Sequence, residues 1–303
     1  MPAIPSDFGE KEFETHLYTQ LGGSNPSVWS PTQVFEAYIG IDRAMFLYDA
    51  RLWPLFGVTV PPVGVFLNRL DMPFLWRRRK RGNVPNFRLN LFIQAKRSHY
   101  YRWRPERLAK ELPRKVPCWR FDVVPRQQRA LERVAQHLGD RALMVYAAPA
   151  FHRYSQLNSH AFHGSVLTNS TFPLIERLHG HRRWYFTGSG GDGVANPDPE
   201  RIEGVGLTEM INGYVSRLSS ESSGTATEHL GILVERIETG LKEAVSGNDD
   251  RMAAYFQRSR QIDAVAGSYE EFGPSERAFL RVAAFASVFN LEWYALGGTE
   301  RAA

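Results

Sequence analysis

Apolar residues recur along this chain with the periods of helices and strands, and they predict an ordered series of elements. A helix is expected to begin after Ser6-Asp7, which offers an N-cap side chain, and to stop at Gly22-Gly23. Two apolar stretches further along predict strands over residues 42–48 and 91–97. The stretch between these strands has no clear period.

That intervening stretch has a distinctive composition. Residues 53–85 hold five prolines together with several aromatic side chains and a continuous basic run, namely Arg77, Arg78, Arg79, Lys80 and Arg81. Prolines cannot donate to a sheet, so a core strand is not expected here. We interpret residues 53–88 as an insertion carried between two core strands.

A strand, a helix and a second strand are predicted after the basic middle of the chain. Residues 118–124 are typical of a strand, and Pro125 suits the first turn of a helix that Gly139 would end. The apolar face of this helix recurs at helical spacing and comprises Ala130, Leu131, Val134, Ala135 and Leu138. Residues 142–147 then predict a buried strand. The order of elements indicates an α/β fold in which helices flank a mixed β-sheet.

The last third of the chain changes in character. Residues 183–186 favour one more strand, and four helices are then expected over 207–218, 226–245, 249–266 and 274–294. We therefore divide the chain into a domain over 1–195, which carries the insertion, and a helical C-terminal region over 196–303.

The composition is that of an ordinary folded protein, with 43% hydrophobic and 23% charged residues. No apolar run approaches the ~18 residues that a membrane span needs, and no secretory signal is visible near Met1. Cys118 is the one cysteine, so neither an internal disulfide nor a cysteine-based zinc site is possible. These features predict a cytoplasmic protein without a membrane partner.

Positive charge is concentrated in one segment. The chain has a net charge of +5, yet residues 69–115 alone carry fifteen Lys or Arg against three acids, a net +12 that leaves −7 for the remainder. A local basic field of this kind suits a polyanionic partner such as nucleic acid.

Three short motifs suggest what would happen to that partner. Gln94-Ala95-Lys96 ends an apolar strand, and two side chains spaced two apart on a strand share one face. Asp42 opens the earlier strand, and Glu14 follows Phe13 in the first helix. In this order the three motifs resemble the PD-(D/E)XK nuclease superfamily, and they are most similar to Mrr-type restriction endonucleases, in which Gln replaces the acid before the Lys.

The resemblance covers about residues 10–147 and implies a restriction endonuclease-like core. Asp42 would be the principal Mg²⁺ or Mn²⁺ ligand, joined by the side-chain oxygen of Gln94 and the carbonyl oxygen of Ala95. Glu14 would bind the ion or orient the attacking water. Glu36, which precedes the strand of Asp42, is an alternative for that role, and Lys96 would position the water or stabilise the charge on phosphorus.

The resemblance also implies a setting for the activity. Cleavage of phosphodiester bonds in DNA would serve restriction or antiviral defence, and cutting both strands of a duplex favours a homodimer or a partner protein. The chain departs from the family in one respect, because 52 positions separate Asp42 from Gln94. The insertion at 53–88 must account for that length.

Further basic residues are candidates for contacts with nucleic acid. They comprise the run from Arg77 to Arg81 with Arg97, Arg102 and Arg104. Aromatic residues between them, Tyr100, Tyr101 and Trp103, would either stack on bases or pack in the core. The alternative function is therefore a non-catalytic nucleic-acid-binding or interaction protein, and the residues do not separate RNA from DNA.

Two other patterns do not favour a functional site. Histidines at 160, 163, 179 and 181 lack Cys or carboxylate partners at zinc-binding spacing. The glycine-rich run 188–193 lacks the Lys-Ser or Lys-Thr pair of a nucleotide-binding loop. It is expected to form a flexible turn.

Overall fold

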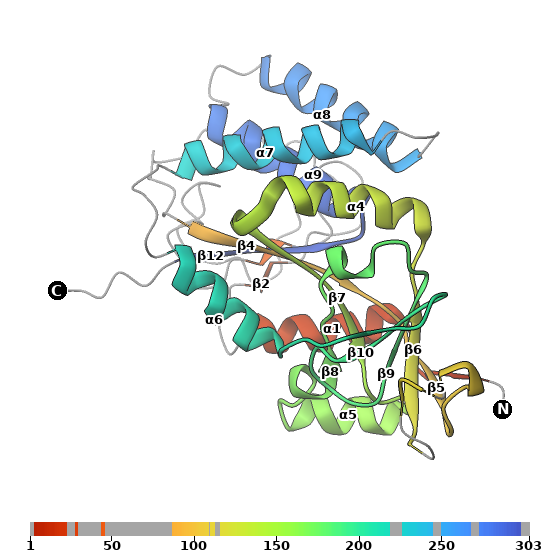
Figure 1. Ribbon diagram of the computed structural model, residues 1–303. Helices are drawn as coiled ribbons and strands as arrows, with labels where there is room; N and C mark the ends of the chain where they lie inside the picture. Colours follow the sequence, from red (N-terminus) through yellow and green to blue (C-terminus); the bar gives the residue numbers. More distant parts are fainter. Residues whose placement is uncertain are drawn as a thin grey trace. The chain divides into compact units, whose positions relative to one another are not determined.

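The structure is a computed structural model in which residues 3–22, 28–29, 44–45, 87–108, 110–112, 116–218, 226–244, 250–267 and 273–297 are described. These residues form seven α-helices, several short 3₁₀ turns and two six-stranded sheets (Figure 1). The fold is therefore mixed α/β, as the sequence predicts.

The chain divides into two compact units, each built from segments that are distant in sequence. The first unit comprises residues 1–24, 93–132 and 144–214, and the second comprises 25–92, 133–143 and 215–303. The sequence predicts two consecutive regions with a boundary at residue 195. That division stays a prediction.

The first unit contains one complete sheet, and every pairing in it is antiparallel. Its strands, in spatial order, are β1 (Ile4–Pro5), β5 (His99–Tyr101), β6 (Cys118–Asp122), β9 (Arg183–Phe186), β10 (Gly193–Asn196) and β11 (Glu200–Ile202). One face of this sheet buries an apolar cluster of Tyr101, Leu108, Leu112, Cys118, Tyr185 and Val194. Burial of apolar area is the main source of its stability.

The second sheet is mixed. Its strands, in spatial order, are β2 (Val28–Trp29), β3 (Ala44–Met45), β12 (Glu292–Gly297), β4 (Phe87–Ala95), β7 (Ala142–Pro149) and β8 (Ser170–Thr171). β12 runs parallel to β3, whereas β2 and β8 each pair antiparallel with a neighbour. All eight residues of β7 are buried, which is typical of a strand covered on both faces.

In the first unit, α1 (Glu10–Gly22) contacts α5 (Tyr154–Phe162) and the 3₁₀ turn at Leu167–Asn169. Phe13 of α1 and Phe8 before it both pack their rings near the ring of Phe151. A side-chain oxygen of Gln20 accepts a hydrogen bond from Leu167 N at 2.8 Å. Apolar and polar contacts together hold the helix in place.

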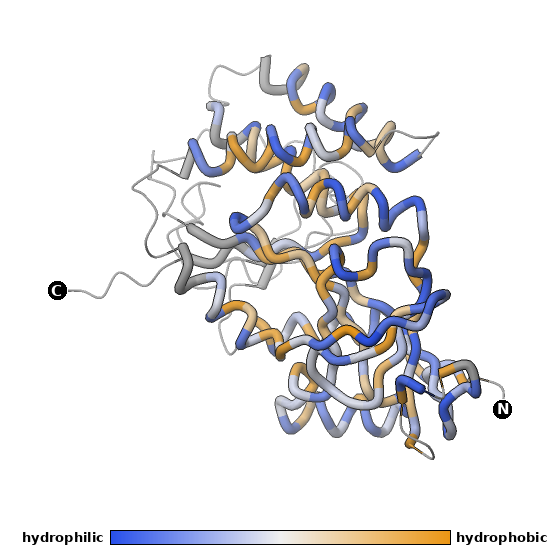
Figure 2. The backbone as a smooth tube through the Cα atoms, viewed as in Figure 1, coloured by the Kyte–Doolittle hydropathy of each residue, from blue (hydrophilic) through white to orange (hydrophobic). Residues whose placement is uncertain are grey.

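In the second unit, α9 (Pro274–Val288) contacts both α7 (Ala226–Glu243) and α8 (Asp250–Gly267). The buried residues of α7 recur at helical spacing, and Figure 2 shows hydrophobic and hydrophilic turns alternating along it. Arg281 of α9 links the other two helices, since it lies 3.3 Å from Glu238 and 2.5 Å from Asp263.

The helix α4 (Pro125–Leu138) contributes residues to both units. Within the second unit, Arg236 of α7 donates to the carbonyl oxygens of His137 and Leu138, so it caps the end of α4. Gly240 of α7 lies so close to α4 that a Cβ atom there would be 2.7 Å from the Cα of Val134. A glycine is required at this point of close approach.

Most predicted elements are confirmed. The first helix, the strand from Cys118, the helix from Pro125, the strand from Ala142 and the helix over 207–218 lie where the pattern places them. The last helix is wrong beyond Val288, because Asn290 has a φ of 55° and Leu291 N donates back to Ala286 O, which ends the helix. Residues 292–297 then form β12.

The glycine-rich run is also not a free turn. Gly190 N donates to Ser170 O and Gly190 O accepts from Phe172 N, so the run is tied to the strand β8. Gly191 lies against Gly204, where a Cβ atom would be 2.6 Å from the carbonyl carbon.

Among the described residues, no helix is long and apolar enough to cross a membrane.

Candidate functional site

The strand β4, which carries Gln94 and Ala95 of the predicted motif, runs parallel to β7. Lys96 N donates to Ala147 O at 2.8 Å, and the side chain of Asn90 donates to Arg141 O at 3.2 Å. From Asn90 to Lys96 on one strand, and from Arg141 to Ala147 on the other, the residue number rises by six. The two strands therefore run in the same direction. Ligands commonly bind at the carboxyl ends of such strands, and Lys96 follows the carboxyl end of β4.

The register places Gln94 and Lys96 on one face. In a parallel ladder, a residue that donates to Ala147 O lies opposite Ala148, and two residues earlier Gln94 lies opposite Tyr146. Gln94 is buried and Lys96 is half-buried. The Lys96 Nζ atom lies 5.4 Å from the centroid of the Tyr146 ring, which is within the range of a cation–π contact.

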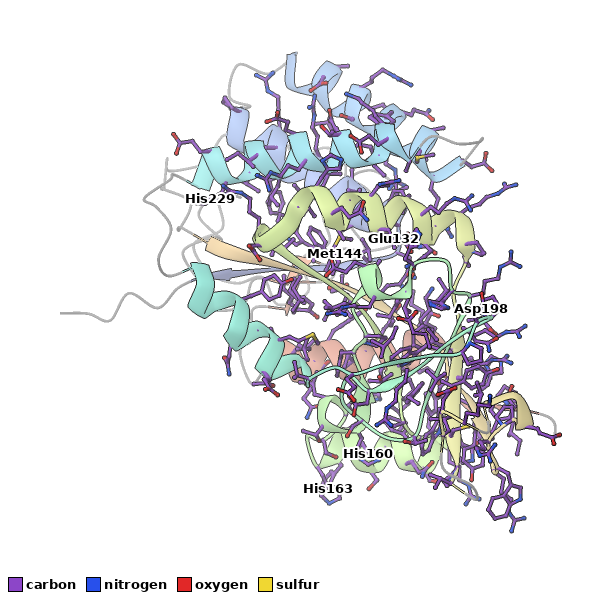
Figure 3. The ribbon with its side chains drawn as sticks, viewed as in Figure 1. Glu132, Met144, His160, His163, Asp198 and His229 are labelled. Carbon is purple, nitrogen blue, oxygen red and sulfur yellow. The ribbon has the colours of Figure 1, made fainter. Side chains whose placement is uncertain are left out.

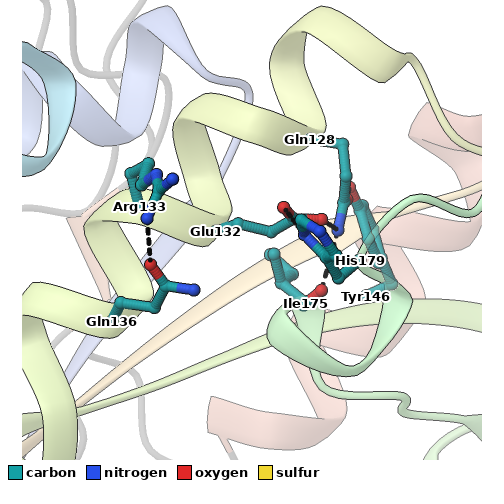
Figure 4. Close-up of polar contacts among 7 residues, drawn as sticks. All are labelled: Gln128, Glu132, Arg133, Gln136, Tyr146, Ile175 and His179. Carbon is teal, nitrogen blue, oxygen red and sulfur yellow. Dashed lines mark hydrogen bonds and ion pairs between the residues drawn. The ribbon is translucent and has the colours of Figure 1, made fainter. Parts of the chain in front are cut away.

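A buried polar array extends from Tyr146 on the same face (Figure 4). The Tyr146 hydroxyl donates to Gln128 Oε1. Gln128 Nε2 in turn donates to Glu132 Oε1 and to Ile175 O, both at 2.7 Å. Glu132 Oε2 lies 2.9 Å from His179 Nδ1, which closes the array.

Burial explains why these contacts must be complete. Gln128, Glu132 and Tyr146 are all buried, and a buried polar group left without a hydrogen bond costs about 1–3 kcal/mol. Burial is the main cause that raises the pKa of Tyr146, and the Glu132 carboxylate adds to it. The phenol therefore keeps its proton and stays a donor to Gln128.

Glu14 is the one predicted acid that the structure describes. It is buried on α1, and Lys11 Nζ lies 3.0 Å from its Oε2 atom. Asp42, Glu36 and the run from Arg77 to Arg81 lie outside the described residues. The convergence of Asp42 on Gln94 therefore stays a prediction.

The donor atoms of the predicted site are hard oxygens. Gln94 and Glu14 offer an amide and a carboxylate oxygen, and Ala95 offers its carbonyl. Such donors suit Mg²⁺ or Mn²⁺ better than zinc. Within the described residues, no three His, Cys, Asp or Glu side chains are grouped so as to hold a metal ion.

The carboxyl end of this strand pair is tied to the N-terminal segment. Ser6 Oγ donates to Ser98 O at 2.8 Å, and Asp7 N donates to His152 O at 2.8 Å. The guanidinium of Arg97 donates to Ser6 O. The segment before α1 therefore joins the residues that follow β4 with those that follow β7.

The structure separates the aromatic residues of the basic segment. Tyr101 is buried in the first sheet, whereas the Tyr100 ring stacks on His152 at 4.0 Å between centroids with an interplanar angle of 2°. Trp103 is 40% exposed, and the guanidinium carbon of Arg102 lies 5.6 Å from its ring centroid. Arg97 and Arg102 are exposed and Arg104 is half-buried.

The four histidines considered for zinc have local partners instead. His160 and His163 lie on or next to α5, where they bond Ser165 Oγ and Ser159 O respectively (Figure 3). His179 bonds Glu132, and His181 bonds Glu200 at 3.1 Å. Each of the four therefore has a hydrogen-bond partner nearby.

Sequence reasoning missed the array around Tyr146. Gln128 and Glu132 lie four residues apart on α4, and this spacing puts two polar side chains on one side of a helix that is otherwise well buried. That signal was available in the sequence. No sequence pattern could identify Tyr146 and His179 as members of the array, because the fold brings them to α4 from distant parts of the chain.

No protein-family model, curated protein or solved structure matches this chain.

Proposed function

We propose that this protein is a metal-dependent endonuclease that cleaves phosphodiester bonds in DNA. One observation supports this function above the others. Gln94 and Lys96 share a face at the carboxyl end of a parallel strand, so an amide oxygen and an ammonium group belong to the same side of it. A divalent ion bound there would act as a Lewis acid on the phosphate.

Each residue has a role that its chemistry suits. Asp42, the oxygen of Gln94 and the carbonyl of Ala95 would hold the ion, and Glu14 or Glu36 would complete the set. Lys96 would position the attacking water or stabilise negative charge on the phosphate. Because Gln94 is an amide, the site has one negative charge fewer than a pair of acids, so it should bind the ion weakly until DNA is present.

The segment that follows the motif along the chain has a composition that suits a polyanion. Residues 97–120 hold eight Lys or Arg and two Glu. Trp103 and Arg102 are both exposed, so an aromatic face and a cation are available together for a nucleic acid. We propose a role in restriction or antiviral defence, with a second copy of the chain or another protein completing double-strand cleavage.

The rival function is nucleic-acid binding without catalysis. The exposed Trp103 and Arg102 side chains support binding in either function, so they do not favour the nuclease over the rival. In that case the strands would be a scaffold and the basic segment the working surface. RNA in place of DNA is compatible with either function.

Substitution of Lys96 distinguishes the two. The wild type should cut plasmid DNA when Mg²⁺ or Mn²⁺ is added, and Lys96→Ala should lower the rate by about 100-fold or more while DNA binding in EDTA is retained. Lys242→Ala, which changes an exposed lysine in the last turn of α7 outside the basic segment, is the control and should cut normally. Binding with no metal-dependent cutting of DNA or RNA by the wild type would favour the rival.

A further inference from the structure

The ammonium group of Lys96 lies over an aromatic ring, and this contact deepens the nuclease proposal, on which it rests. Tyr146 is opposite Gln94 in the strand register and its ring centroid is 5.4 Å from Lys96 Nζ. One ring therefore stands beside both members of the motif. The attraction between an ammonium group and a ring face restricts a side chain that otherwise has four rotatable bonds.

The ring itself has one orientation. An amide oxygen accepts and cannot donate, so the Tyr146 hydroxyl must donate to Gln128 Oε1. The amide nitrogen of Gln128 uses both hydrogens, one to Glu132 Oε1 and one to Ile175 O. Flipping the amide would set its oxygen against two other acceptors, Glu132 Oε1 and Ile175 O, so the amide oxygen stays directed at the phenol and holds it.

The array reaches the surface at its far end. The side chain of Glu132 is 5% exposed, whereas that of His179 is 79% exposed. The carboxylate accepts from His179 Nδ1 and from Gln128. These hydrogen bonds join three parts of the first unit. Tyr146 belongs to β7, Gln128 and Glu132 belong to α4, and His179 belongs to the turn after Leu178.

We propose that Tyr146 is a positioning residue for Lys96, and that Gln128 and Glu132 hold its ring for that purpose. Lys96 would reach a bound phosphate with its ammonium group already placed. Displacement of a reacting group by ~1 Å is enough to cost about 100-fold in rate, so such support has a measurable effect.

A spectroscopic test needs no enzymatic activity. Lysines are dimethylated with ¹³C-formaldehyde, and the Lys96 methyl signal is assigned by its loss in Lys96→Arg. The ring current of Tyr146 should move this signal upfield in the wild type. Tyr146→Phe keeps the ring and should keep the shift, whereas Tyr146→Leu should abolish it. An unshifted Lys96 signal in the wild type, or the same shift in Tyr146→Leu, would overturn the proposal.

A kinetic test then asks whether the contact matters for cutting. Tyr146→Leu should lower kcat by about tenfold or more with KM for DNA nearly unchanged, and Tyr146→Phe should recover most of that loss. Tyr255→Phe is the matched control, since Tyr255 is equally buried and its hydroxyl bonds Glu238 on another helix. It should leave kcat unchanged.

The two tests fail in different ways. If the wild type cuts nothing and the methyl signal is shifted, the nuclease function is wrong but the contact is real. If the wild type cuts DNA and Tyr146→Leu keeps its kcat, the nuclease function stands and Tyr146 is not a positioning residue.

Should Tyr146→Leu fail to fold, Gln128→Leu takes its place. This variant keeps the Tyr146 ring but removes the acceptor of its hydroxyl group. An unchanged kcat there would overturn the support that we assign to Gln128.

Discussion

Glu132 is a buried carboxylate whose contacts come from two other residues. Gln128 donates to one of its oxygens at 2.7 Å, and His179 lies 2.9 Å from the other. A second Glu–His pair provides a natural comparison. His137 and Glu243 lie 2.8 Å apart, close to the 2.9 Å of the first pair, but the Glu243 side chain is 51% exposed. Burial, and not the contact distance, distinguishes the two pairs.

Alanine at each of these glutamates should therefore have unequal effects. Glu132→Ala should lower the free energy of unfolding by about 1–3 kcal/mol, because it leaves one buried N–H of the Gln128 amide without an acceptor. Glu243→Ala should cost about 0–1 kcal/mol, as for an exposed ion pair. Urea denaturation measures both, and equal losses would contradict the role of burial.

His152 gives the protein a pH dependence whose sign can be stated. Burial, assisted by the charge of Arg153, lowers the pKa of His152 below its usual 6.5, although Asp7 opposes the change. Below pH 6.5 the unfolded chain then binds more protons than the folded chain. Stability should rise with pH through this window, and it should be lost as the pH falls below 6.5 toward the lowered value.

Replacing His152 removes part of that dependence. The urea midpoint of His152→Gln should change less between about pH 5 and pH 7 than that of the wild type. The slope is compared in place of the midpoint itself, because the substitution also removes the stacking on Tyr100. A steeper or unchanged slope would contradict the assignment.

Among the elements, α4 and β12 show what the sequence can and cannot predict. The apolar stripe of α4 has a clear helical period, with Pro125 and Gly139 as its boundaries, and the helix lies as expected. Glu292, Trp293 and Tyr294 are all buried, so no alternation identifies a strand. β12 forms by pairing with strands far away along the chain, β3 on one side and β4 on the other. A chain-local pattern carries no information about such a pairing.

The candidate site divides in the same way. The spacing of Gln94 and Lys96 placed them on one face of a strand, and the register agrees. Tyr146 and His179 are 18 and 47 residues from their partners on α4. Their hydrogen bonds follow from the packing of a helix and a turn around β7, which no motif encodes.

The glycine-rich segment before β10 is an element fixed by close approach. A Cβ atom at Gly191 would lie 2.6 Å from the backbone of Gly204, whereas one at Gly188 would meet nothing within 4 Å. Gly191→Ala should therefore lower the free energy of unfolding by about 1–3 kcal/mol, and Gly188→Ala should have little effect. Thermal or urea unfolding of the two variants checks this. Equal stability would show that the backbone moves to accommodate the added methyl group, and it would contradict the prediction.

For the whole molecule, charge and site are combined in one stretch of chain. Residues 69–115 carry a net +12 within a protein of net +5, and they include Gln94, Ala95 and Lys96. In the proposed function, this segment attracts the polyanion to the part of the chain that carries the predicted metal ligands. The proposed function requires that Asp42, from a distant part of the chain, also reaches this point.

A crystal structure of the protein soaked with Mn²⁺ tests that requirement most directly. We predict an ion bound between the carboxylate of Asp42 and the side-chain oxygen of Gln94, at oxygen–metal distances of about 2.0–2.5 Å, with Lys96 beside it. Anomalous scattering identifies the ion. A site without Mn²⁺ in which the Asp42 carboxylate and the Lys96 ammonium group lie more than ~12 Å apart would contradict the account, since no single ion and its neighbouring water span that gap.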